Sequence, residues 1–126
     1  MTRLFIILAL GACADTLDDR IAELDARADV DCGTLGDCPS QERAEGVATC
    51  LRDNLAAGVT AKAGVAVNFE EYEYIYATDG ALVSLFGHSF GDDDIFTEYR
   101  CRDVGVSVSG VCAQLRAIDC EEVREW

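Results

Sequence analysis

The sequence predicts an α+β fold in which one main helix packs on a four- to five-stranded antiparallel meander that disulfides hold together. Apolar residues recur at helical spacing between positions 44 and 55. From position 59 onward they alternate with polar residues, as in half-buried strands. Seven cysteines in 126 residues point to an oxidising compartment. A chain of this length has room for one hydrophobic core, so we expect a single domain.

The first twelve residues, MTRLFIILALGA, are typical of a targeting signal. Arg3 supplies the positive charge, and the apolar run from Leu4 to Leu10 is far shorter than the roughly 18 residues of a spanning helix. Leu10-Gly11-Ala12-Cys13 matches a lipobox, and in this feature the chain resembles a bacterial lipoprotein precursor. The alternative is an ordinary secretory signal followed by a chance cysteine.

The resemblance implies a lipid anchor. In that family the cysteine thiol receives a diacylglyceryl group, the signal is cut before the cysteine, and the new amino terminus is usually acylated. Residues 1–12 would then be removed, and membrane lipid would be the partner of acylated Cys13. Two or three acyl chains would hold the protein firmly, because each buried CH₂ contributes about 0.8 kcal/mol. Ala14, which stands where an aspartate would favour the inner membrane, implies the outer membrane.

Six further cysteines are candidates for disulfides, and an even number in an exported chain predicts three bonds with 15 connectivities open. Cys112 and Cys120 are near enough in sequence to pair locally, and a Cys50–Cys101 bond would tie the helix to the sheet. Structural zinc is disfavoured because the chain has no C-x-x-C pattern and a single histidine. The six candidates are Cys32, Cys38, Cys50, Cys101, Cys112 and Cys120.

Residues 13–31 are expected to form an acidic, partly helical tether between the lipid and a domain that spans 32–126. Thr16 can cap a short helix, and Asp18 and Asp19 in its first turn favour the helix dipole. A coiled coil is a weaker alternative, because the segment is shorter than three heptads.

The main helix is expected to follow a loop at 32–39, with Ser40 as its N-cap and Gly58 after its last turn. Its apolar face would comprise Ala44, Val47, Ala48, Leu51 and Leu55.

Strands are predicted beyond the helix, at about 59–69, 72–78, 81–90, 95–102 and 104–109. Asp79-Gly80 is a strong signal for a two-residue hairpin turn. Residues 111–124 carry Val111, Leu115 and Ile118 at helical spacing, so a short closing helix is expected there.

Sequence patterns for catalysis are weak, and neither a catalytic residue nor a cofactor or metal is expected. Ser84 and His88, four residues apart on one strand, would lie roughly 13 Å apart, too far for a nucleophile and its base. Glu71 and Glu73 share a strand face and could in principle act as a pair of acid/base carboxylates, as in a glycosidase. In a chain this acidic, however, two acidic residues on one solvated face are expected without any such role. Calcium binding by Asp92, Asp93, Asp94 and Glu98 is less expected than an acidic turn.

Tyr72, Tyr74 and Tyr76 form the one concentration of aromatic residues and would share a strand face. Tyrosine is enriched at interfaces because it supplies contact area at low entropic cost. The stripe is therefore a candidate partner-binding surface. The alternative is a sheet face packed beneath the main helix.

The net charge of −14 disfavours nucleic-acid binding, which needs clustered lysine and arginine. These observations together predict a lipid-anchored exported domain that binds a partner without catalysis, similar in type to small cysteine-rich lipoproteins of unknown function. The alternative is an acidic inhibitor of a cationic hydrolase such as a lysozyme or protease, since opposite charges speed encounter. An enzyme with a site assembled across the sheet is a third hypothesis.

Overall fold

The structure is a computed structural model that describes residues 16–66, 71–90 and 93–126, with the backbone alone at 88–90, 93 and 94. Cys13 and the lipobox lie outside the described residues. In chain order the elements are α2 (Leu17–Arg27), β1 (Val30–Leu35), α3 (Gln41–Ala57), β2 (Ala61–Ala66), β3 (Glu71–Thr78), β4 (Ala81–Phe90), β5 (Asp93–Cys101), β6 (Asp103–Ser109), β7 (Cys112–Ile118) and β8 (Glu121–Glu125).

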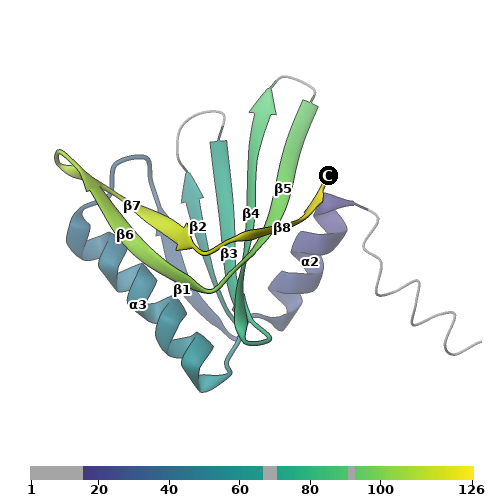
Figure 1. The fold of residues 1–126 in the computed structure, drawn as a ribbon, viewed down its shortest axis with the longest axis horizontal. Helices are drawn as coiled ribbons and strands as arrows, with labels where there is room; N and C mark the ends of the chain where they lie inside the picture. The colour runs from purple at the N-terminus through teal and green to yellow at the C-terminus, as the bar shows by residue number, and fades with distance from the viewer. Residues whose placement is uncertain (1–15, 67–70, 91–92) are drawn as a thin grey trace, which may run out of the picture.

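The predicted α+β class is confirmed, and the sheet is mostly antiparallel. Within the described residues, six strands form one sheet in the order β1-β2-β3-β4-β5-β8, and β6 and β7 form a separate hairpin. The pair β1–β2 is parallel, because α3 carries the chain back between these two strands. In Figure 1, α3 lies beside the β6–β7 hairpin and α2 lies at the β5 side of the sheet. The expected count of four to five strands was therefore too low.

Helix α3 forms where the sequence predicts the main helix, and both of its ends are capped. The Arg43 N–H donates to Ser40 Oγ over 3.2 Å. Gly58 ends the helix in the left-handed region with φ 73°, a conformation that a residue with a Cβ rarely adopts. Its apolar face is fully enclosed at Ala44, Ala48 and Leu51.

The Asp79-Gly80 turn joins β3 and β4 as predicted. Both residues have positive φ, 53° and 76°, which matches the twist of the flanking strands in a two-residue turn. The strands on either side pair without interruption from Thr78↔Ala81 to Glu71↔His88.

The expected loop at 32–39 was wrong in its first half, which belongs to β1. This strand pairs with β2 and has a bulge between Asp31 and Gly33. The Asp31 carboxylate accepts the Gly33 N–H over 2.9 Å. Glycines and cysteines at this point weaken the alternation that marks a strand, so a pattern reading assigns it to a loop.

The expected closing helix at 111–124 was also wrong, because these residues form β7 and most of β8. The helical spacing is misleading, since Val111 is 90% exposed. Ala113 and Leu115 are buried instead, at the spacing of two that belongs to a strand.

Three disulfides are present, as the cysteine count predicts, but both suggested pairings were wrong. Cys32 on β1 is bonded to Cys50 on α3, and Cys101 at the end of β5 is bonded to Cys120. The third bond joins Cys38 to Cys112 across 74 positions and so attaches the β6–β7 hairpin to the loop before α3. In the chain-entropy model the bonds that close the two shorter loops each stabilise the fold by roughly 3 kcal/mol and the bond that closes the longest loop by roughly 4.5 kcal/mol.

The sheet buries both faces, and each face has its own hydrophobic cluster. One cluster lies beneath α3 and the β6–β7 hairpin and includes Ile75, Ala77 and Leu82. The other lies beneath α2 and includes Leu24, Tyr76 and Phe96. Neighbours along β3 alternate between the two clusters, so the helices cover opposite faces.

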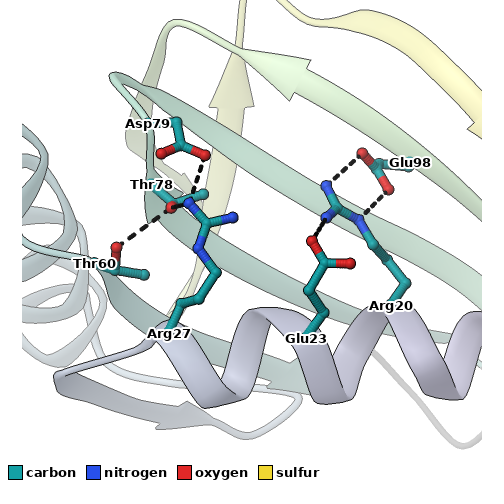
Figure 2. A network of polar contacts seen from close by, with 7 residues as sticks. All are labelled: Arg20, Glu23, Arg27, Thr60, Thr78, Asp79 and Glu98. Atoms are coloured by element: carbon teal, nitrogen blue, oxygen red, sulfur yellow. Dashed lines mark hydrogen bonds and ion pairs between the residues drawn. The ribbon is translucent and has the colours of Figure 1, made fainter. Parts of the chain in front are cut away.

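Helix α2 is packed on the sheet, so the prediction that its residues form part of a tether was wrong in this respect. Leu24 is 0% exposed. Arg20 makes a two-pronged contact with Glu98 on β5, at 2.9 Å from Nε to Oε1 and 3.0 Å from Nη2 to Oε2 (Figure 2). The Glu98 side chain is only 6% exposed. At the other end of the helix, Arg27 donates to Thr78 and Asp79 at the β3–β4 turn.

We expect Arg20→Leu to lower the free energy of unfolding by about 3 kcal/mol, because it leaves the buried Glu98 carboxylate without its cation. The double variant Arg20→Leu/Glu98→Leu removes both charges and should recover a large part of that loss. Urea denaturation of the four proteins in this double-mutant cycle measures the coupling. The control is Arg116→Leu on the exposed side of β7, which should change stability by about 0.5 kcal/mol or less. Equal costs for Arg20→Leu and Arg116→Leu would show that the pair does not hold α2.

Gly87 on β4 has no side chain, and the Phe96 ring occupies the space that a side chain at this position would fill. A Cβ at position 87 would lie 2.4 Å from Phe96 Cγ and 2.6 Å from the Ile95 carbonyl oxygen. We therefore expect Gly87→Ala to destabilise the protein by about 1–3 kcal/mol. Gly46→Ala is the matched control, since it lies on the exposed face of α3 with nothing within 4 Å. It should stabilise the helix by about 0.5–1 kcal/mol. Thermal unfolding of both variants compares them, and a neutral Gly87→Ala would contradict this packing.

Candidate functional site

A groove of about 450 Å³ lies on the α2 face of the sheet, where the helix leaves β1, β2 and part of β3 uncovered. Its walls come from elements that are distant in sequence. Helix α2 supplies Ile21 and Asp25 on one side, and the first two strands supply the other. The remaining lining residues are Asp31, Thr34, Lys62, Ala63, Gly64, Val65, Ala66, Tyr72, Tyr74 and Tyr76.

The three tyrosines predicted to share a face all line this groove, and their exposure falls steadily along β3. Tyr72 is 36% exposed, Tyr74 is partly buried, and Tyr76 is 2% exposed. Opposite the first two, β2 presents only Ala66 and Gly64. The groove exists because rings on β3 stand beside residues that have almost no side chain on β2.

Tyr76 is almost completely buried, so it stabilises the groove and contributes little to its accessible surface. Its hydroxyl donates to Asp25 Oδ1 on α2 over 2.8 Å. Burial, together with this carboxylate, raises the pKa of Tyr76 far above its usual value, so the hydroxyl stays protonated at all physiological pH values. The Lys62 ammonium lies 3.7 Å from the same Asp25 oxygen.

Tyr74 is held by an aromatic contact behind the groove. Its ring stacks on that of Phe96 with centroids 6.4 Å apart and planes inclined by 19°. Such pairs contribute about 0.5–1.5 kcal/mol beyond their buried area. Tyr74 thus enters the groove as a pre-ordered ring, which lowers the entropy that a ligand would have to remove.

The alternative prediction for the tyrosines was that they pack beneath the main helix, α3. It was wrong, because they lie on the face that α2 covers in part. The face beneath α3 carries Glu71, Glu73 and Ile75, and the tyrosines occupy the opposite face. Only Tyr76 is covered, and α2 covers it. Whether Tyr72 and Tyr74 bind a partner stays a prediction.

A second cavity, of about 230 Å³, lies on the α3 face beside β7. It contains Glu73, which the sequence analysis assigned to a solvated acidic face. Ser84 Oγ donates to Glu73 Oε2 over 2.5 Å, and Ser84 is itself 2% exposed. Burial raises the pKa of Glu73, although the Ser84 hydrogen bond acts in the opposite direction. Pattern reasoning missed this site because β7, which closes it, was expected to be helical.

The other residues considered for chemistry are engaged elsewhere or lie outside the description. All six candidate cysteines are in disulfides, so none of them is a free nucleophile. Glu98 is paired with Arg20. The side chains of His88, Asp93 and Asp94 and all of Asp92 fall outside the described parts. Among the described residues, no three His, Cys, Asp or Glu side chains converge as a metal site.

Comparison with protein-family models, curated proteins and solved structures finds no significant match to this chain. Neither helix in the described ranges is long and apolar enough to cross a membrane.

Proposed function

We propose that this protein is an exported, lipid-anchored binding domain of the cell envelope whose tyrosine groove receives a cationic segment of a partner protein. The observation that carries the proposal is the groove itself, whose lining combines two partly exposed tyrosine rings with two aspartates. It acts by binding and not by catalysis.

The chemistry of the groove favours a cation. Arginine and lysine are attracted to the faces of tyrosine rings, with about 0.5–1 kcal/mol at exposed sites and about 2 kcal/mol where water is excluded. Asp25 and Asp31 add negative charge, and the only cation in the described lining, Lys62, is already close to Asp25. The net charge of −14 would attract a basic partner from a distance.

The lipobox supports attachment to the membrane, and the disulfides support export. Three disulfides suit an oxidising compartment, where they persist. Acylation at Cys13 would hold the folded domain close to the membrane surface, with only the few residues before Leu17 between the lipid and α2.

The acidic-inhibitor hypothesis is the second candidate, and the same net charge favours it. It differs in one measurable respect. An inhibitor blocks the activity of a basic lysozyme or protease at stoichiometric concentration, whereas a binding domain that captures a basic segment leaves that activity intact.

We expect a fluorescent decapeptide of alternating arginine and glycine to bind the protein, with an affinity that falls as salt rises. Tyr72→Ala and Tyr74→Ala should each weaken binding by about three- to tenfold, because each removes one ring face. Tyr72→Phe keeps the ring and should bind as the wild type does. Fluorescence anisotropy provides the affinities.

The controls are a glutamate–glycine decapeptide, which should not bind, and Val123→Ala, an exposed substitution on β8 away from the groove. Equal binding of the two peptides, or unchanged affinity in both alanine variants, would refute a cation-binding groove.

The anchor has its own test in the intact mass of the protein extracted from bacterial membranes. The expected mass corresponds to a chain that starts at Cys13, carries lipid on that residue and has lost six hydrogens to three disulfides. Cys13→Ser should yield protein without the lipid and release it from the membrane fraction. Recovery of wild-type protein with Met1 intact and no lipid would contradict the proposed anchor.

A further inference from the structure

The cavity on the α3 face has the make-up of a binding site for a small molecule. It lies on the opposite face of the sheet from the tyrosine groove, and among the described residues the two share only Val65 and Ala66 at the end of β2. Its walls come from the loop before α3, from β7 and from the adjoining ends of β2, β3 and β4. Leu35, Val65, Phe86 and Leu115 give it an apolar interior. The loop wall is held to β7 by the Cys38–Cys112 disulfide and by the bond from the Ala113 N–H to the Pro39 carbonyl, 2.9 Å long.

The charged residues that line this cavity in the described part of the chain are all acidic. The described residues that line it include the carboxyl groups of Asp37, Glu71 and Glu73 and no lysine, arginine or histidine. Glu73 is flanked across the sheet by Val65 on β2 and Phe86 on β4, which are both apolar. Its position is set by the buried Ser84 hydroxyl, which donates to one carboxyl oxygen.

A carboxylate in apolar surroundings is costly unless a cation or several hydrogen bonds compensate it. The hydrogen bond from Ser84 supplies one donor. Burial raises the pKa of this carboxyl group, the direction expected where apolar surroundings disfavour its charged form. A ligand that carries its own positive charge would satisfy the same carboxylate directly.

We propose that this cavity binds a small primary organic ammonium with an apolar body, and that the Glu73 carboxylate is its counter-ion. The ammonium group would sit at Glu73, and the apolar body would lie against Phe86 and Leu115. Where the free carboxyl group is still protonated, it must lose that proton to pair with the cation, so binding is coupled to proton release over the pH range in which Glu73 titrates.

The size of the cavity limits the ligand. A dry apolar cavity of about 150 Å³ holds a benzene ring, so about 230 Å³ has room for one ring or short chain with an aminomethyl group. Drug-sized ligands occupy cavities of about 300–1,000 Å³. Among peptides, no more than a single terminal residue would fit, and a free monoamine fits whole.

Other groups around the cavity also bear on its pH dependence. Asp37 on the loop and Glu71 on β3 line it with Glu73, and Gln114 from β7 offers a neutral amide. His88 on β4 occupies the register position opposite Glu71. The test must therefore isolate Glu73 from these neighbours by substitution.

The experiment uses benzylammonium as the probe and benzyl alcohol as its uncharged counterpart of similar shape. Chemical shifts of the Leu35 and Leu115 methyl groups, which line the cavity and not the groove, and isothermal titration calorimetry follow binding at neutral pH. Benzylammonium should saturate a single site and bind at least tenfold more tightly than benzyl alcohol. The comparison is made on the wild-type chain, so it does not depend on any variant folding. Absence of saturable shifts, or equal affinity for the two probes, overturns the proposal.

Glu73→Gln removes the charge while its amide oxygen still accepts from Ser84. It should weaken benzylammonium at least tenfold and leave benzyl alcohol unchanged. Glu122→Gln on β8 is the matched control and should bind as the wild type does. Tyr72→Ala should also bind normally, so failure of the groove proposal and failure of this one are distinguishable. Undiminished binding to Glu73→Gln would overturn the assignment of the counter-ion.

The pH dependence supplies a second readout. A folded-state pKa above the unfolded value contributes stability that is present at low pH and lost as pH rises through the folded pKa. Glu73→Gln should remove this loss, so its stability relative to wild type should increase with pH. Over the same range wild-type affinity for benzylammonium should rise, and the calorimetric heat should vary with the ionisation enthalpy of the buffer. Affinity and heat that do not change with pH or buffer would contradict the coupled proton release.

Discussion

The two-pronged contact between Arg20 and Glu98 is the interaction on which the arrangement of this molecule depends. A sheet with two apolar faces must cover both of them, and α3 with the β6–β7 hairpin can cover only one. The second face is covered by α2, which is 11 residues long and buries a single side chain completely. A helix of that length is marginal without tertiary contacts. The buried ion pair gives α2 a defined position and direction on the sheet.

The placement of α2 creates the candidate binding groove. The helix covers Val83, Leu85 and Tyr76 and stops short of β1 and β2. The uncovered half of the face then presents tyrosine rings beside Gly64 and Ala66. Because Tyr76 is bonded to α2 through Asp25 and Tyr74 rests on Phe96, the groove is built from the same contacts that fix the helix. The stability of α2 on the sheet and the shape of the groove are therefore linked.

The opposite face follows a different construction. There the covalent bonds matter most, since Cys38–Cys112 attaches the hairpin to the loop and Cys32–Cys50 attaches α3 to β1. The cavity around Glu73 lies where the loop before α3 and strand β7 meet the sheet. The two candidate sites are thus on opposite faces of one sheet and differ in character. The groove is open and aromatic, whereas the cavity is smaller and has an apolar interior into which the half-buried Glu73 carboxyl group projects. Both would attract positively charged groups, in keeping with the acidity of the chain.

Local patterns in the sequence determined several parts of this protein. Ser40 and Gly58 mark the ends of α3, Thr16 marks the start of α2, and Asp79-Gly80 marks a hairpin, because capping and turn geometry depend on a few adjacent residues. The alternation of Tyr72, Tyr74 and Tyr76 likewise assigned them to one face. The even set of six cysteines established the number of disulfides, although not their pairing.

Only the tertiary structure decided the rest, because it depends on contacts between residues far apart in the chain. Spacing in sequence does not reveal that Arg20 meets Glu98, 78 positions away, or that Cys38 meets Cys112. Strand β1 is stabilised by its parallel partner more than by its own composition, and β7 by burial of Ala113 and Leu115 against α3. In the same way, only the tertiary structure shows that Tyr76 meets Asp25 on α2 and that Glu73 meets Ser84 on the neighbouring strand. Local chemistry specified the elements, and burial of both faces of the sheet specified where they meet.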